Sequence, residues 1–506
     1  MKSNDPLYQL IKTLSGTEKR YFKLHANKQE GKKDYLDLFD FIDKQKKYDE
    51  TKLKESFKTR DFIKHIPVVK NYLFNAIIDS LHEFSKYDTA QYKIEELLKK
   101  IAVLYQKGLI DLCIKYIEKA KKIAEDHECF PDLIKLLEIQ YQISIKNSSR
   151  LFSERKEIQA ELKLSVEKYY NFCQYTQLHS DINDFLYRQN LPIESPEIQN
   201  VLHLPLLMKP DMALSVRANE LYFIIHSRVC EYMGDMKMAS TYMFNLLKTY
   251  ESKPGLLQEY PLKYARAING YLQSTFDAKK FEHFNHYLGV LENLLELKIS
   301  SENKNFIKGL YYVNLFIRNV EYGLFKEIVD VIEKIELDVV QNTLVPAKIR
   351  IIILYHECVA FIGNEQYKEA LKLINTFLTT NENIIPVIKR ASKLIGLVCQ
   401  YELGHIDQLE NEILSIDRNI AVLNNTEGEK LFLKHLKKII KAMEKKDVLQ
   451  QFNYFNKDLI HLSDSASSFS VLRYFDVISW TESKSRNISF ASVVKEKAKQ
   501  HHANSN

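Results

Sequence analysis

The sequence predicts an all-α protein made of stacked antiparallel helical hairpins, with a small helical bundle at its N-terminus. Three observations predict this fold class. Glycine and proline are scarce, at 13 and 11 of 506 residues, which favours long helices. Apolar residues recur at helical spacing along most of the chain. One apolar stripe occurs in five copies that are 39 to 45 residues apart, an interval typical of helical repeats.

The clearest hairpin spans residues 354–378 and turns at Gly363 and Asn364. Each of its two helices carries one apolar stripe at helical spacing. The first stripe is Leu354, Cys358 and Phe361, and the second is Tyr367, Ala370, Ile374 and Phe377. Two apolar stripes that face each other predict two helices packed together across the turn.

The second stripe of this hairpin recurs at offsets of zero, three, seven and ten residues. Four further copies begin at Met236, Phe281, Phe325 and Ile406, and an earlier copy begins at Ile110. A glycine stands just before most copies, where we expect it to adopt the left-handed conformation that ends a helix. These glycines are Gly108, Gly234, Gly323, Gly363 and Gly404.

Two segments carry a resemblance to a known family. Residues 234–247 and the run Tyr367-Lys368-Glu369-Ala370 resemble the turn and second helix of the tetratricopeptide repeat, with Ala239 and Ala370 as the small residue at a helix crossing. The likeness covers residues 215–420 and, more loosely, 95–175. It implies a tetratricopeptide-like right-handed superhelix with a concave groove that binds a peptide or a protein.

The chain also departs from that family. The family repeat is about 34 residues long, and the interval here is longer by roughly two helical turns. Phe284, Ile328 and Leu409 stand where the family has alanine. A helical repeat of the forty-odd-residue kind therefore stays open as an alternative.

Composition and pattern divide the chain into five parts. They are an N-terminal helical bundle (1–90), a first helical-repeat segment (91–187), a Pro-rich connection (188–213), the main helical-repeat array (214–425), and a C-terminal basic helix with capping helices (426–506). The connection holds four prolines, which no continuous helix accommodates. It is either a hinge between two arrays or an ordered loop packed on the array, and its many apolar residues favour the loop.

The N-terminal part, residues 1–90, is predicted to form four or five short helices. Ser15 and Glu18 form a capping box that starts a helix at Thr17. Basic residues exceed acidic ones here, and small basic helical modules include DNA-binding domains. Because these basic residues are spread around the helices, nucleic-acid binding is the weaker alternative.

One candidate binding surface follows the array, on a helix predicted over residues 428–446. One face of this helix is apolar, with Phe432, Leu436, Ile439, Ile440 and Met443. The other face is a stripe of lysines: Lys430, Lys434, Lys437, Lys438, Lys441 and Lys445. The stripe could receive an acidic protein, a phosphorylated partner or an anionic surface. The alternative is the solvated face of a terminal helix.

Motifs of catalysis and cofactor binding are missing from the sequence. It contains no GxGxxG, GxxxxGK[ST], HExxH or GxSxG motif, and no second pair completes a metal site with His283 and His286. We therefore expect no enzyme activity, no cofactor and no metal. No apolar run approaches the ~20 residues of a membrane span, and the first residues lack the apolar core of a secretory signal. We expect a cytoplasmic protein.

Two functional hypotheses follow. The first is a non-catalytic protein–protein interaction scaffold that binds a peptide or a partner helix in the repeat groove. The alternative is a regulator whose N-terminal bundle contacts nucleic acid or a signalling protein under control of the repeat array. The expected partner is a protein or a peptide, and the sequence predicts no oligomeric state.

Overall fold

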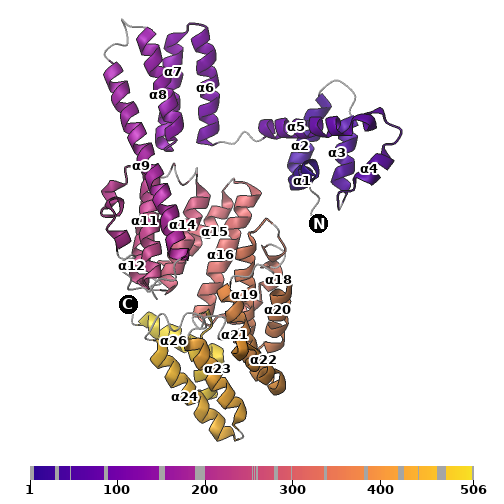
Figure 1. Cartoon of the computed structure of the whole chain (residues 1–506), viewed down its shortest axis with the longest axis vertical. Helices are drawn as coiled ribbons and strands as arrows, with labels where there is room; N and C mark the ends of the chain where they lie inside the picture. Colours follow the sequence, from indigo (N-terminus) through magenta and orange to yellow (C-terminus); the bar gives the residue numbers. More distant parts are fainter. Residues whose placement is uncertain are drawn as a thin grey trace. The chain divides into compact units, whose positions relative to one another are not determined.

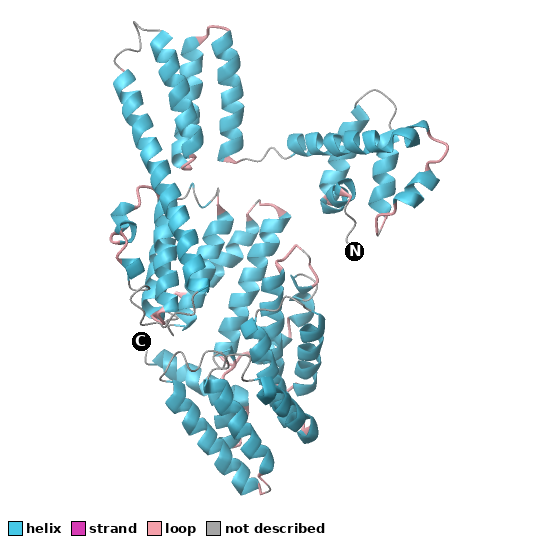
Figure 2. Cartoon of the chain, in the orientation of Figure 1, coloured by secondary structure: helices cyan, strands magenta, loops and turns pink. Residues whose placement is uncertain are grey.

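The structure is a computed structural model of the chain, and its described residues form helices joined by loops and turns (Figure 2). It describes residues 5–28, 34–45, 47–84, 89–146, 154–188, 200–253, 255, 257, 260–277, 283–297, 299–335, 339–342, 344–380, 386–419, 427–442, 444–463 and 474–503. None of these residues lies in a β-strand, so the all-α fold class is confirmed. The chain forms two compact units, Met1–Leu162 and Lys163–Asn506.

The first unit begins with a group of short helices around one apolar core. They are α1 (Pro6–Thr13), α2 (Gly16–Lys28), α3 (Asp34–Lys44), α4 (Glu50–Ser56), the 3-10 helix η1 (Asp61–His65) and α5 (Ile66–Phe84). Leu38, Ile42 and Leu73 are fully buried in this core. The predicted capping box is confirmed, because Ser15 N donates to Glu18 Oε2 at 2.7 Å and Glu18 N donates to Ser15 Oγ at 3.2 Å.

The rest of the first unit has a second core of its own, between longer helices. These are α6 (Ala90–Gln106), α7 (Ile110–Asp126), α8 (Phe130–Lys146) and the start of α9 (Arg155–Arg188). Lys121 on α7 is buried among them and is paired with Glu161 at 2.8 Å. Its ammonium also donates to Gln140 Oε1 at 3.2 Å, so the charge has partners on two neighbouring helices.

The second unit continues α9 and adds the remaining helices, most of which are labelled in Figure 1. Its elements are η2 (Pro205–Leu207), η3 (Pro210–Met212), α11 (Val216–Tyr232), α12 (Met236–Glu251), α14 (Pro261–Asp277), α15 (Phe284–Asn293), η4 (Leu294–Glu296), α16 (Ser301–Glu321), α17 (Phe325–Val329), α18 (Ile332–Ile335), α19 (Ala347–Gly363), α20 (Tyr367–Thr380), α21 (Pro386–Glu402), α22 (Ile406–Asn419), α23 (Glu427–Lys441), α24 (Lys445–Ser463), α25 (Val477–Arg486) and α26 (Phe490–Ala503). From α19 onward each helix contacts the next one along the chain.

The predicted second-helix stripe is buried in the second unit at its offset-three position, whereas Ile406, the first position of the last copy, is 37% exposed. The position at offset three is at most 1% exposed in every copy, whichever residue occupies it: Ala239, Phe284, Ile328, Ala370 and Leu409. Bulky side chains therefore fit at the same buried position as alanine. The alignment of the copies places these five residues at the same offset, and all five are buried.

Helix α19 is buried more widely than its predicted stripe indicates. Besides Cys358, the residues Ile351, Ile353, Tyr355 and Val359 are also buried, although they point in different directions around the helix. The cause is that α16, α17, α20 and α21 all contact α19. A helix with buried residues on most sides lies in the interior of the unit, and α19 is such a helix even though Leu354 and Phe361 of its predicted stripe are only partly buried.

Four of the five predicted turn glycines adopt the left-handed conformation. Positive φ angles occur at Gly108, Gly234, Gly323 and Gly404. The prediction for Gly363 is wrong, because that residue ends α19 and the left-handed residue is Glu365, with φ 60°. A Cβ atom on Gly363 would lie 2.2 Å from the ring of Phe325. This glycine therefore permits close packing between α19 and α17.

The described part of the Pro-rich connection, residues 200–213, is an ordered loop. Asn171 on α9 donates to the Met212 carbonyl and accepts from the Leu214 amide, both at 3.0 Å. His226 Nε2 on α11 donates to the Leu207 carbonyl at 3.0 Å. The loop interpretation is confirmed for these residues, and residues 189–199 lie outside the described ones. The boundary between the two compact units falls within α9, between Leu162 and Lys163. The five-part division of the chain stays a prediction.

Candidate anionic-partner surface

Helix α23 carries the predicted lysine stripe on one side and packs its other side into the core. Phe432, Leu433, Leu436 and Ile439 are at most 2% exposed. The ring of Phe432 meets Phe455 of α24 at a centroid distance of 5.7 Å, nearly edge to face. This apolar contact fixes the rotation of α23, so the opposite side of the helix faces outward.

The single tryptophan joins the C-terminal helices to the array. Trp480 on α25 is 1% exposed, and its Nε1–H donates to Glu402 Oε1 of α21 at 2.7 Å. Lys484 of α25 binds the other oxygen of the same carboxylate at 2.6 Å. The ring of Trp480 also stacks on Phe432 at 6.3 Å. The surface of α23 is therefore supported from behind by two other helices.

A histidine pairs with an aspartate at one edge of the contact between α23 and α24. His435 is 2% exposed, stacks on Phe455 at 4.9 Å and donates from Nε2 to Asp458 Oδ2 at 2.8 Å. Burial lowers the pKa of His435, and the nearby ammonium groups of Lys438 and Lys434 lower it further, against the raising effect of Asp458. The pair sets which turns of the two helices are neighbours.

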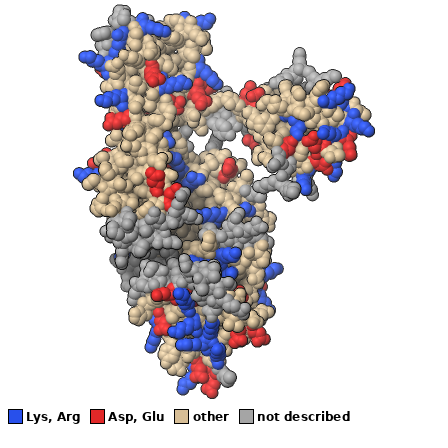
Figure 3. Space-filling view, in the orientation of Figure 1, with Lys and Arg blue, Asp and Glu red and all other residues tan. Residues whose placement is uncertain are grey.

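Five of the six predicted lysines lie on one face of α23. At 100° per residue they fall within an arc of about 100°, and the row is about 16 Å long. Lys430, Lys434, Lys438 and Lys441 are exposed, and Lys437 is half-buried. Figure 3 shows basic side chains gathered over α23. The structure therefore brings these five residues together, as the spacing predicts.

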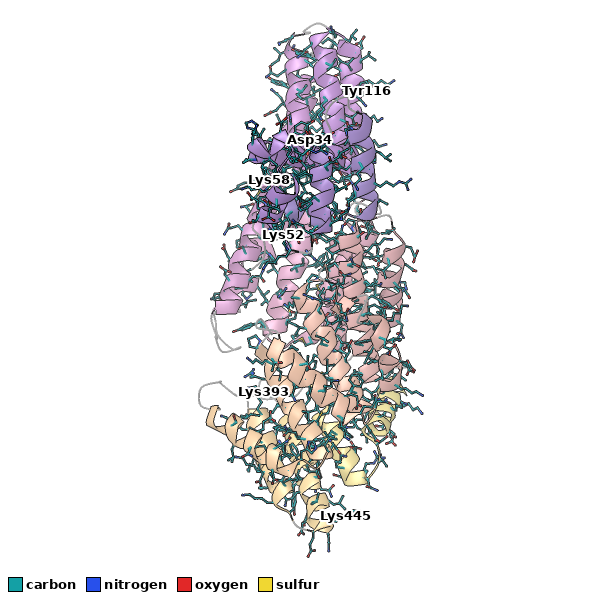
Figure 4. The ribbon with its side chains drawn as sticks, turned by 90° about the vertical axis from the view of Figure 1, so that its right-hand side faces the viewer. Asp34, Lys52, Lys58, Tyr116, Lys393 and Lys445 are labelled. Carbon is teal, nitrogen blue, oxygen red and sulfur yellow. The ribbon has the colours of Figure 1, made fainter. Side chains whose placement is uncertain are left out.

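The sixth lysine does not belong to this helix. We expected one helix over 428–446, but α23 ends at Lys441 and α24 begins at Lys445. Figure 4 labels Lys445 at the turn between the two helices. The turn contains no glycine or proline, so the pattern gave no sign of it. Met443, which we expected on the apolar face, lies outside the described residues.

The exposed lysines of α23 have no acidic partner among the described residues. No described carboxylate lies within 4.0 Å of the ammonium of Lys430, Lys434, Lys438 or Lys441. Glu429 of the same helix is buried and lies 3.7 Å from Arg390. Lys438 and Lys441 also face the negative end of the helix dipole, which gives them a modest stabilising role.

The described residues give no support to a metal site at His283 and His286. His283 stacks on Phe244 at 5.3 Å. Over the part of the chain that is described, no cluster of three His, Cys, Asp or Glu residues could hold a metal ion. The described helices also include none with the length and apolar character needed to span a bilayer.

Sequence reasoning missed the contribution of α24 to this surface. The pairing of His435 with Asp458 joins residues that are 23 positions apart, and their types and spacing alone do not indicate it. The one signal that could have indicated this contact is His435 itself, a histidine next to Leu436 of the predicted apolar face. The chain matches no known protein family, no curated protein and no solved structure.

Proposed function

We propose that this protein is a non-catalytic interaction scaffold that binds a protein or peptide partner. In this proposal the array of residues 214–425 forms a tetratricopeptide-like right-handed superhelix, and its groove takes a peptide or a partner helix. Stacked helical hairpins expose a long surface relative to their core, which suits binding to extended partners. The continuous apolar core shared by α11 through α19 supports the stacked arrangement.

The lysine row of α23, which lies outside the groove of residues 214–425, is the observation that supports binding of a protein partner. Four exposed ammonium groups stand on one helical face without a described acidic partner, on a helix that is packed firmly from behind. A binding surface held rigid before the partner arrives loses less conformational entropy on binding. Charges of one sign on such a surface also steer an oppositely charged partner toward it.

The alternative of a nucleic-acid-contacting regulator has less support. In the described part of the N-terminal bundle, seven basic residues already form ion pairs with acidic residues of the bundle. They are Lys19, Lys23, Lys52, Lys54, Arg60, Lys64 and Lys70. The neighbouring carboxylates lower the local positive potential that would attract phosphates to the bundle. A role of the bundle in contacting a signalling protein stays a prediction.

A cytoplasmic location fits the proposal. The six cysteines are free thiols, and four of them are buried: Cys113, Cys230, Cys358 and Cys399. Burial raises the pKa of Cys399 to about 12, so this thiol is unreactive at neutral pH. Free cysteines of this kind are typical of reducing compartments.

Affinity capture with quantitative mass spectrometry tests the scaffold proposal. The tagged full-length chain is expressed in its own cells, beside a chain without residues 1–90 and a chain with Lys430, Lys434, Lys438 and Lys441 changed to Gln. We expect a small set of proteins that the full-length chain enriches in a saturable way. If competition with untagged protein displaces none of the captured proteins, the scaffold proposal is wrong.

A further inference from the structure

The exposed side of α24 adjoins the lysine row of α23. Because the chain reverses direction between Lys441 and Lys445, the two helices run antiparallel, and the pair formed by His435 and Asp458 marks one edge of their contact. Seen along the axis of α23, Lys438 lies about 60° from His435, on the side away from the core. Seen along the axis of α24, Tyr454 lies about 40° from Asp458, also on the side away from the core. Residues from both helices therefore form one continuous surface.

The part of this surface on α24 is mixed in character. Tyr454 is 48% exposed, and its hydroxyl accepts a hydrogen bond from Gln450 Nε2 at 3.0 Å. Lys457 is exposed one turn further along the same side. A tyrosine on the same side of the helix as a lysine offers apolar area together with a hydroxyl. The side chain of Asp458 is 54% exposed and adds one acidic group at the border.

We propose that this surface binds an acidic helical segment of a partner protein. The surface, which we call the α23–α24 face, consists of Lys430, Lys434, Lys438, Lys441, Tyr454 and Lys457. The inference rests on the proposed scaffold function and specifies the chemistry of one of its partners. It is distinct from the groove of residues 214–425, because α23 and α24 follow that array in the chain.

The spacing of the lysines favours a helical partner. Successive exposed lysines on α23 are separated by four, four and three residues, so they follow the turns of the helix. A second helix with Glu or Asp at the same spacing presents a carboxylate to each ammonium in turn. Each such exposed pair contributes little alone. Four pairs on a rigid face, together with the Tyr454 ring, provide a specific contact.

The composition of the face disfavours phosphate-rich partners. Residues 427–463 contain no arginine, the residue that recognises phosphate with two parallel hydrogen bonds. Two exposed acidic residues, Glu444 and Asp447, lie at the turn between the helices, and Asp458 lies beside His435. All three repel phosphates. Tyr454 is the only exposed aromatic residue described on the face, so bases lack a stacking platform. These three acidic groups also repel an acidic protein segment, but such a segment can place its own lysines opposite them, and it needs neither arginine forks nor a stacking platform.

A direct binding measurement tests the inference. The probe is a fluorescein-labelled alanine-rich helical peptide with Glu at every fourth position, and a second peptide with Gln at those positions serves as its neutral match. Both are titrated with the full-length chain, and binding is followed by fluorescence anisotropy at about 50 and about 150 mM salt. We expect the Glu peptide to bind and the Gln peptide to bind at least about tenfold more weakly.

Three variants distinguish the effect of losing lysines on the α23–α24 face from the effect of lowering the net charge of the protein. The first, Lys434→Gln with Lys438→Gln and Lys441→Gln, is expected to weaken binding of the Glu peptide about tenfold. The second makes the same charge change at exposed lysines of the first unit, Lys99→Gln with Lys115→Gln and Lys119→Gln, and is expected to bind within about twofold of the native chain. The third, Lys430→Gln with Lys434→Gln, leaves the C-terminal turn of α23 intact and is expected to give an intermediate loss. Circular dichroism melting checks that all three remain folded.

A charge exchange sharpens the test. Lys434→Glu with Lys438→Glu is expected to lose the Glu peptide and to bind a matching peptide with Lys in place of Glu. Equal losses in the first and second variants would overturn the inference, because they would reflect net charge alone. Tighter binding of a 20-base-pair DNA duplex or of phosphatidylserine vesicles than of the Glu peptide, lost in the first variant, would also overturn it.

The two proposals fail in distinguishable ways. If the Glu peptide does not bind but the captured proteins persist in the chain with all four lysines changed, the inference fails and the scaffold proposal stands. If the peptide binds at the α23–α24 face but no captured protein is displaced by competitor, the scaffold proposal fails instead.

Discussion

Gly363 at the end of α19 lies against the ring of Phe325 on α17, so closely that a Cβ atom at position 363 would be 2.2 Å from a ring carbon. Phe325 is 1% exposed and also stacks on Phe490 of α26, at 5.4 Å. The ring is therefore packed on two sides. This contact joins α17, α19 and the C-terminal helix.

Replacing Gly363 with Ala should destabilise the protein. The added methyl group would overpack the contact with Phe325, at a cost of about 1–3 kcal/mol. Chemical denaturation followed by circular dichroism measures the change. The matched control is Gly289→Ala in α15, where nothing lies within 4 Å of the added atom and the higher helix propensity of alanine should stabilise by about 0.5–1 kcal/mol. A destabilisation of the same size in both variants would contradict the packing explanation.

The repeat alignment predicts different effects at two adjacent positions of α20. Ala370 is fully buried and Glu369 is exposed. Ala370→Phe should overpack the helix crossing and cost about 1–3 kcal/mol, whereas Glu369→Phe should change stability by less than about 0.5 kcal/mol. Thermal melting of the two variants provides the comparison. Similar shifts in melting temperature would show that the register is wrong.

The carboxylate of Glu402 should be a strong link between the array and α25, since it accepts from Trp480 and Lys484 together. Glu402→Ala leaves a buried indole N–H without its partner and should cost about 1–3 kcal/mol. Glu402→Gln keeps an acceptor for Trp480 and should cost less. Fluorescence of Trp480, the only tryptophan in the chain, reports the docking of α25 directly. A red-shifted emission in the native chain would contradict burial of this ring.

Acidification should destabilise the second unit before its carboxylates titrate. Burial lowers the pKa of His226, His356 and His435 below their ordinary value of 6.5. The unfolded chain then binds more protons than the folded one once the pH falls below about 6.5, so stability is lost from there downward. Melting temperatures between pH 7.5 and pH 5.5 test this direction. His226→Gln, which can still donate to the Leu207 carbonyl, should weaken the pH dependence.

The fold could be predicted where local sequence determines it. Glycine at positions 234 and 404 ends a helix by its backbone freedom alone, and the structure has positive φ at both. The burial of Ala239 and Leu409 likewise follows from spacing within one helix. These features depend on neighbours within a few residues, which is the range over which a single sequence is informative.

Features that depend on distant contacts could not be predicted. The role of Gly363 is set by Phe325, which belongs to another helix. The lysine row was found because its members share one helical face, but the end of α23 at Lys441 was missed because the turn holds no glycine or proline. The pairing of His435 with Asp458 requires the two helices to be placed first.

The hydrogen bond from the Tyr355 hydroxyl to the Tyr474 carbonyl, at 2.9 Å, spans 119 residues of chain. Tyr355 belongs to the buried central helix α19, and the contact of Phe325 with Phe490 spans a still longer stretch. During synthesis, the middle of the second unit emerges from the ribosome well before the segment that completes its core. Its apolar faces therefore stay uncovered until the C-terminal helices are made, which exposes the nascent chain to aggregation. A chain truncated before residue 474 would keep the same faces uncovered permanently.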